Sequence, residues 1–264
     1  MLATLAAPLL IVTAYSLLTR GAYGGVQLPW TVESYARFFD PLYGIILLRS
    51  FVTAAIATAL CIVLGFPLAL FIAQSGAQSG ARKNLYLSLV ILPFWTSFLI
   101  RLYAWMFLLR DTGLINSVLL SWGWIREPLP MLYSNGAVIL GLVYGFLPFA
   151  VLPMYATLER LDKNLLEAAA DLGARPLSVL ARVTIPLCAP GISAAAILVF
   201  IPCLGTYITS DLLGGSKTIL IGNLVQNQFT TARDWPFGAA VSLILMALAV
   251  GLLLSVRRRG EDLL

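Results

Sequence analysis

Six long apolar runs, separated by short polar stretches, dominate the pattern of this chain. None of them alternates polar and apolar residues as a membrane β-strand would. Each is close to the length, about 20 residues, that a helix needs to cross the hydrocarbon core of a bilayer. The six predicted spans are Leu2–Leu18, Phe51–Ala73, Leu85–Leu109, Ala137–Ala156, Ile192–Thr209 and Ala239–Val256. The pattern therefore predicts an all-α, polytopic membrane protein with about six transmembrane helices, in a single domain over residues 1–264.

The first run could instead be a secretory signal peptide. Such a peptide begins with a basic segment, and here the first basic residue is Arg20, after the run has ended. We therefore interpret the first run as a span.

The basic residues indicate how the chain is oriented in the membrane. Arg257, Arg258 and Arg259 follow the last run directly, and cytoplasmic flanks of spans are rich in Lys and Arg. With an even number of spans, this pattern predicts cytoplasmic N- and C-termini. Arg20 alone would favour the opposite orientation.

Composition excludes several functions. The chain is 60% hydrophobic and 11% charged, and its net charge of +5 is scattered between the runs, which argues against nucleic-acid binding. The sequence has no His and only three widely spaced Cys, so it lacks the usual zinc sites, a Ser–His–Asp triad and a disulfide framework. No phosphate-binding GxxxxGK[ST] motif occurs. We expect no catalytic residue, no metal site and no cofactor bound by this chain, which is therefore not an enzyme.

One polar stretch, residues 158–188, is patterned like a pair of short helices. Asp162 suits the N-cap of a helix over Asn164–Leu172, and Gly173 suits the left-handed position just past its end. Pro176 then suits the first turn of a second helix, which Pro186 should end.

The first of these helices is predicted to be amphipathic. Leu165, Leu166, Ala169 and Leu172 recur at helical spacing, with Glu167 on the other side. From the pattern alone, the helix could equally lie flat on the membrane surface.

The segment EAAADLGARPLSVLARVTIP resembles the signature loop of the inner-membrane permeases of ATP-binding-cassette importers. That pattern is Glu-Ala-Ala, three residues, Gly, nine residues and Ile-x-Leu-Pro. The matching residues are Glu167, Ala168, Ala169, Gly173 and Pro186. Val183 and Ile185 replace the Ile and Leu of the family, both conservatively.

The resemblance implies the type I importer permease fold, in which this loop forms a cytoplasmic coupling helix that docks in a groove of an ATPase subunit. The implied coupling residues are Glu167, Ala168, Ala169, Asp171, Gly173, Ala174 and Pro186. Glu167 would be the polar anchor, Ala168 would permit close approach, and Gly173 would set the turn. The implied partners, besides membrane lipid, are a second homologous permease, two ATPase subunits that bind ATP and Mg, and a periplasmic solute-binding protein. The location would be the bacterial inner membrane.

Two further segments resemble permeases of spermidine/putrescine importers. These are LPFWTSFLIRLYAW in the third run and SDLLGG…IGNLVQNQF…RDWPFGAA after the fifth. The implied cargo is a polyamine, moved into the cytoplasm by alternating access. The alternative is the same importer class carrying ferric iron, an opine or another organic ion.

A flexible polycation needs carboxylates and aromatic faces along its path. The candidate path residues are Asp211, Tyr207, Trp95, Tyr103 and Trp105. Asp211 could instead cap a helix or pair with Lys217, and the aromatic residues could be interfacial belt residues. Arg101, within the third run, has two possible explanations. It could pair with a carboxylate of a partner subunit or extend towards an interface, and an anionic cargo would also use it.

Two smaller features leave alternatives open. The stretch QLPWTVESYARFF could be a short interfacial helix or a plain loop. Gly141 and Gly145 form a GxxxG pair that allows a close helix contact, with a helix of this chain or of a second subunit.

Overall fold

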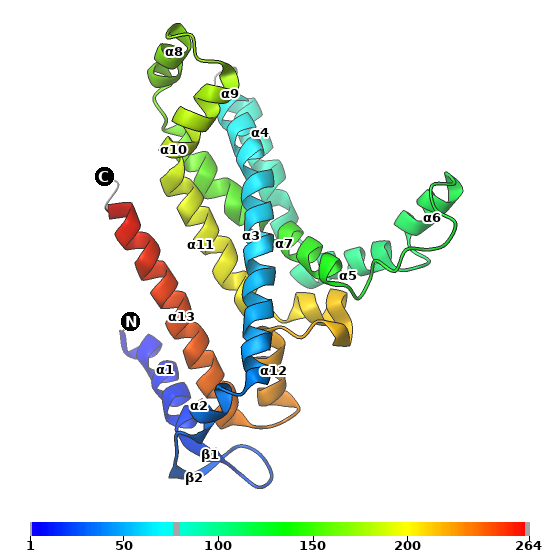
Figure 1. The fold of residues 1–264 in the computed structure, drawn as a ribbon, viewed down its shortest axis with the longest axis vertical. Coiled ribbons are helices and arrows are strands. Elements are labelled where there is room, and N and C mark those ends of the chain that lie inside the picture. The colour runs from blue at the N-terminus through cyan, green and yellow to red at the C-terminus, as the bar shows by residue number, and fades with distance from the viewer. Residues whose placement is uncertain (1, 76–79, 262–264) are drawn as a thin grey trace. The chain divides into compact units, whose positions relative to one another are not determined.

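The computed structural model describes residues 2–75 and 80–261, and within them the chain is helical apart from one two-stranded ribbon and its loops. The chain divides into two compact units (Figure 1). Unit 1 comprises Met1–Thr53, Leu132–Asn135 and Leu204–Leu264, and unit 2 comprises Ala54–Met131 and Gly136–Cys203.

Unit 1 contains both ends of the chain. Its elements are α1 (Leu2–Ser16), β1 (Leu18–Arg20), β2 (Val26–Trp30), α2 (Glu33–Phe38), the start of α3 (Pro41–Ser75), the π-helix η3 (Ser210–Gly214), η4 (Gly215–Lys217), α12 (Ile221–Thr230) and α13 (Trp235–Glu261). The antiparallel ribbon pairs Leu18 with Trp30 and Arg20 with Val26.

The core of unit 1 forms where α2 and α12 pack against α13. The buried residues of this core are Phe38, Ile221, Leu224, Phe237 and Val241. α1 runs along α13, and the rings of Tyr15 and Trp235 stack with their centroids 6.1 Å apart. Of the two alternatives for QLPWTVESYARFF, the structure contains a short helix, α2, which buries Phe38 in this core while Phe39 stays exposed.

A buried ion pair joins α2 to the start of α13. Asp234 is buried and accepts a hydrogen bond from Arg37 Nη1 at 2.8 Å. The same carboxylate accepts the N–H of Phe237 at 3.3 Å, in the first turn of α13. Burial by itself lowers the pKa of Arg37. The hydrogen bonds and charges of Asp234 and Tyr43 together raise the pKa by more than burial lowers it, so it lies above its usual value. Arg37 therefore stays charged at physiological pH.

Unit 2 contains the middle of the chain. Its elements are the rest of α3, α4 (Gly80–Ile91), η1 (Leu92–Trp95), α5 (Phe98–Leu109), α6 (Leu114–Ser121), α7 (Asn135–Glu159), α8 (Lys163–Asp171), α9 (Pro176–Val179), the π-helix η2 (Leu180–Thr184), α10 (Ile185–Leu187) and α11 (Ala189–Gly205).

Glycines let the helices of unit 2 approach closely. A Cβ at Gly65 of α3 would lie 3.0 Å from Met154 of α7, and one at Gly191 of α11 would lie 2.5 Å from the Thr157 hydroxyl of α7. A Cβ at Gly145 would lie 2.6 Å from the ring of Phe98. At this position of the GxxxG pair, the close neighbour is therefore a side chain of the same chain.

The predicted spans correspond to straight helices, to bent pairs of helices and to one short helix. By length and apolar composition α3, α7 and residues Trp235–Ser255 of α13 could each cross a membrane as straight helices. Two bent helix pairs bring the number to five among the described residues if each pair is one span. The first predicted span is α1, an apolar helix of 15 residues over Leu2–Ser16, which is shorter than the about 20 residues of a full crossing.

The prediction of an uninterrupted third span was wrong. α4 and η1 end at Trp95, and the chain bends by 88° before α5 begins at Phe98. Thr96 between them is extended, with φ −91° and ψ 146°. Pro93 has no N–H to bond to the carbonyl four residues before it, which fits the change from α4 to the 3₁₀-helix η1 just ahead of the bend.

The fifth predicted span differs at its end. α11 stops at Gly205, and residues up to Thr209, which the prediction included, belong to a separate turn that leads into η3. A further bend of 66° separates Pro176–Leu187 from α11.

Candidate functional site

The stretch of residues 158–188, which we call the coupling loop, forms α8 and α9 with a glycine turn between them. Asp162 Oδ1 accepts the N–H of Asn164 at 3.0 Å, which confirms it as the N-cap of α8. Gly173 follows the helix with φ +81°, the left-handed conformation that was predicted for it. Pro176 is the first residue of α9, also as predicted. The two helices are thus set by local residues.

The second helix continues from α9 through the π-helix η2 and the short α10 and ends at Leu187, one residue beyond the predicted end at Pro186. A proline in an α-helix clashes with the carbonyl four residues before it. The wider π-turn before Pro186 relieves that clash, which explains why the helix can continue.

The apolar side of α8 is uncovered in this chain. Leu172 is 89% exposed, and Leu165 and Leu177 are also exposed. Of the predicted coupling residues, Glu167, Ala168, Asp171, Gly173 and Pro186 are exposed, and Ala169 and Ala174 are half-buried. An exposed apolar surface rimmed by charged residues is typical of a protein or membrane contact.

The coupling loop stands at the end of unit 2 where α4 begins and α7 ends (Figure 1). There Lys83 of α4 forms an ion pair with Glu159 of α7 and lies 5.8 Å from the ring of Tyr155. This ion pair links the start of α4 to the end of α7, where the coupling loop begins.

The carboxylate of Asp211 is held by an amide rather than by a cation. Asp211, in η3, is exposed, and its Oδ1 accepts a hydrogen bond from Asn223 Nδ2 of α12. Across residues 2–75 and 80–261, no ion pair joins Asp211 to Lys217. The alternative of an Asp211–Lys217 pair is therefore not what the structure contains.

The four aromatic residues predicted for the path lie in both units. Tyr207 is in unit 1 with Asp211, and Trp95, Tyr103 and Trp105 are in unit 2. Trp95 is 86% exposed, whereas Trp105 is half-buried and meets the ring of Tyr144 edge-on at 5.5 Å.

Arg101 of α5 is enclosed by aromatic rings of unit 2. Its guanidinium carbon lies 5.2 Å from the ring centroid of Phe94, 5.5 Å from that of Phe98 and 5.9 Å from that of Tyr144. The residue is only 9% exposed, and its Nε and Nη1 have no hydrogen-bond partner in the described part of the chain. Aromatic faces are thus the neighbours that the described part of this chain offers to the Arg101 cation.

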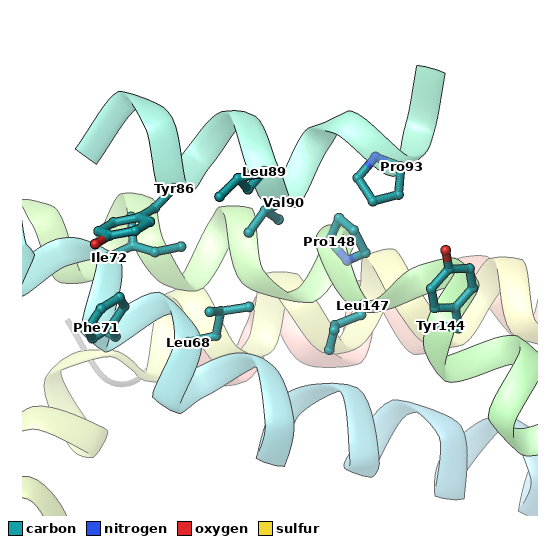
Figure 2. Close-up of a pocket in the computed structure, with 10 residues that line it drawn as sticks. All are labelled: Leu68, Phe71, Ile72, Tyr86, Leu89, Val90, Pro93, Tyr144, Leu147 and Pro148. Carbon is teal, nitrogen blue, oxygen red and sulfur yellow. The ribbon is translucent and has the colours of Figure 1, made fainter. Parts of the chain in front are cut away.

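Unit 2 also contains an apolar pocket of about 330 Å³ between α3, α4 and α7 (Figure 2). In Figure 2 the side chains of Leu68 and Phe71 from α3 face those of Tyr86 and Val90 from α4. The lining contains no charged residue, so the pocket has no carboxylate to pair with an ammonium group. It includes none of the predicted path residues.

Asn223 is the residue that sequence reasoning missed. It lies within the quoted segment IGNLVQNQF, at the third position of α12. A polar residue near the start of a helix is a known capping signal, and it could have drawn attention to this position. The described residues contain no group of three or more His, Cys, Asp or Glu side chains that could hold a metal.

Comparison with known proteins gives a family match and close relatives. Residues 65–258 match the family model described as the binding-protein-dependent transport system inner membrane component. The chain is 46% identical over 257 residues to the spermidine/putrescine transport system permease protein PotB of Escherichia coli, covering 97% of this chain and 92% of the relative. It is 42% identical to the protein of the same name from Haemophilus influenzae, covering 97% of this chain and 88% of the relative.

A solved structure has a similar fold. It is that of a bacterial ABC transporter involved in the import of the acidic polysaccharide alginate, and the match has a TM-score of 0.69 at 16% identity. The match covers 89% of this chain and 85% of the solved one. At this identity the comparison bears on the fold alone.

Proposed function

Because this chain belongs to the family of binding-protein-dependent transport system inner membrane components, we propose that it moves polyamines such as spermidine and putrescine into the cytoplasm. It is a multi-pass inner-membrane transport subunit and not an enzyme. The observation that carries the choice of cargo is the 46% identity, over 97% of the chain, to a spermidine/putrescine permease.

The coupling loop would transmit the energy of ATP hydrolysis. The uncovered leucines of α8 and α9 offer an apolar face to an ATPase subunit, with Glu167 as its polar anchor and Ala168 permitting close approach. A short helix fixed by an N-cap and a glycine turn can pass movement to the spans as a rigid body. The loop would then switch the permease between inward-open and outward-open states.

The transporter would contain a second homologous permease, two ATPase subunits and a periplasmic solute-binding protein. This chain would act as one permease domain over residues 1–264 and bind no cofactor, while the ATPase subunits bind ATP and Mg. Support for the kind of external partner comes from a second solved structure with a similar fold. That structure is an alginate ABC transporter in complex with a periplasmic protein, and the match has a TM-score of 0.65.

Both termini would lie in the cytoplasm. The Lys83–Glu159 pair agrees with the predicted order of spans, which puts the start of α4 and the end of α7 on the same side, and it is equally compatible with either orientation. The Arg257–Arg259 cluster after the last span agrees with cytoplasmic termini through the positive-inside rule.

In the polyamine path, Asp211 would supply the negative charge, and Tyr207, Trp95, Tyr103 and Trp105 would supply aromatic faces. Tyr207, Trp95 and Tyr103 are exposed, which leaves their rings available to a cation.

The cargo is tested by uptake of labelled spermidine in the native host, with this gene deleted and then restored in a strain that lacks other polyamine importers. We expect uptake to fall to background on deletion and to return with the wild-type gene. Unchanged uptake after deletion would contradict a polyamine cargo.

The coupling loop is tested separately by Glu167→Arg. This change places a like charge against basic partners of the anchor, so we expect uptake to fall at least tenfold and the ATPase subunits to be lost from the purified transporter. Glu127→Arg, at an exposed position in the loop after α6, is the matched control and should retain both. Normal uptake with Glu167→Arg would contradict the assignment of this loop whatever the cargo.

A further inference from the structure

One side chain, Asn223, connects the start of η3 to the start of α12 through all of its polar atoms. Its Oδ1 accepts the N–H of Leu220 at 3.0 Å and the hydroxyl of Ser210. Its Nδ2 donates to the carbonyl of Tyr207 at 3.3 Å and to Oδ1 of Asp211. An amide with both donors and both acceptor positions in use has one orientation.

The backbone that carries Asn223 is fixed from two sides. A Cβ at the preceding Gly222 would lie 2.8 Å from the carbonyl oxygen of Thr206 and 2.9 Å from that of Gly205, so α12 begins in direct contact with the end of α11. The N–H of Ile221 donates to Ser50 Oγ of α3 at 2.8 Å. The amide is therefore held in place as well as in orientation.

The hydrogen bond from Asn223 reaches only one of the two oxygen atoms of the Asp211 carboxylate. Oδ1 is occupied, whereas none of the side chains that the structure describes bonds to Oδ2, and the residue is exposed. A Lys or Arg at position 223 would cancel the charge of Asp211. The neutral amide orients the carboxylate and leaves its charge intact.

We propose that Asn223 is the positioning residue of a cation site at Asp211, which leaves one carboxylate oxygen free to accept one ammonium group of the cargo. The inference rests on the proposed function, since it assumes that the cargo is a polyamine. Charge-assisted hydrogen bonds of this kind need a fixed acceptor, because a freely rotating carboxylate loses conformational entropy on binding. The site would take a primary ammonium end of spermidine or putrescine as it enters the path.

The test uses the complete transporter, reconstituted with its other subunits in liposomes and supplied with spermidine-loaded binding protein. The readout is the amount of spermidine transported per ATP hydrolysed. We expect Asp211→Asn and Asn223→Ala each to lower this ratio about tenfold, which corresponds to about 1.4 kcal/mol, the low end of what a hydrogen bond to a charged group contributes. ATP hydrolysis stimulated by the binding protein should change less than about twofold, because neither residue touches the coupling loop.

Combining the two changes separates positioning from a general structural role. If Asn223 acts through Asp211, Asn223→Ala should add less than about twofold in the Asp211→Asn background. Asn227→Ala, one turn further along α12 at an exposed position, is the matched control and should retain the wild-type ratio.

Three results would overturn the proposal, and they have different meanings. Independent, multiplying effects of Asn223→Ala and Asp211→Asn would contradict positioning alone. An equal loss of transport and ATP hydrolysis in Asn223→Ala would assign that residue to the stability of the fold. A wild-type transporter that does not move spermidine would instead contradict the proposed function.

Discussion

Among the buried polar side chains of this largely apolar chain, Arg101, Asp234 and Asn116 are each stabilised differently. Arg101 lies among three aromatic rings, and Asp234 pairs with Arg37. Asn116 is fully buried and bonds to the backbone of Arg110 and of Leu129, so that it fastens the chain after α6 to the end of α5. Burying a polar group costs free energy unless it finds such partners, so each contact is a point where one substitution has a large effect.

Replacing Asp234 tests this at the residue scale. Asp234→Ala removes both the partner of Arg37 and the acceptor for the N–H of Phe237 in the first turn of α13. We expect a loss of about 2 kcal/mol in the free energy of unfolding, less than for a fully buried pair because Arg37 is partly solvated. The apparent melting temperature in detergent should fall by roughly 4–8 °C. Asp111→Ala, at an exposed position, should shift it by under about 2 °C, and equal shifts for the two would contradict the role of the pair.

At the scale of elements, breaks in the helices decide where side chains point. The bend after Trp95 redirects α5, so that Phe98 meets Gly145 and Arg101 meets Tyr144. A straight helix through this segment would have placed these residues differently. The π-turn before Pro186 has the opposite effect, because it lets the helix continue past a proline.

Gly222 tests the contact between two elements. In Gly222→Ala the new methyl group would collide with backbone carbonyl oxygens of Gly205 and Thr206, which cannot rotate away as a side chain can. We expect a loss of roughly 1–3 kcal/mol in stability, measured by thermal unfolding in detergent. Gly44→Ala in α3, where a Cβ has no neighbour within 4 Å, should be neutral or slightly stabilising. A destabilised Gly44→Ala with an unaffected Gly222→Ala would refute this contact.

For the whole molecule, the central property is which loops face which side of the membrane. The ribbon of unit 1 and the start of α4 are separated in the chain by one predicted span, so they should lie on opposite sides. The proposed orientation places Tyr23 outside and Asn84 inside. The native Cys61, Cys188 and Cys203 are all buried, so an introduced cysteine can be labelled against little background.

The orientation is tested with Tyr23→Cys and Asn84→Cys and a membrane-impermeant maleimide. Tyr23 is 98% exposed and Asn84 is exposed, so each introduced thiol is open to the reagent. We expect intact spheroplasts to label only Tyr23→Cys and inside-out vesicles to label only Asn84→Cys. The reverse pattern would show the opposite orientation, which Arg20 alone had favoured. Labelling of the unmodified chain measures the background of the native cysteines.

The sequence by itself determined the features that depend on near neighbours in the chain. The apolar runs follow from composition, since lipid accepts only apolar side chains over about 20 helical residues. Asp162, Gly173 and Pro176 act within a few residues of themselves, through an N-cap, a left-handed turn and a pre-set φ, so their roles could be predicted.

Only the tertiary structure decided the features that join distant residues. Arg37 and Asp234 lie 197 positions apart, and no pattern in the sequence pairs them. Asp211 could have paired with Lys217, six positions away, but the packing of α12 against the end of α11 brings the amide of Asn223 to it instead. A polar side chain in an apolar chain must find a partner. Its type is predictable from chemistry, but the residue that fills the role depends on which helices pack together.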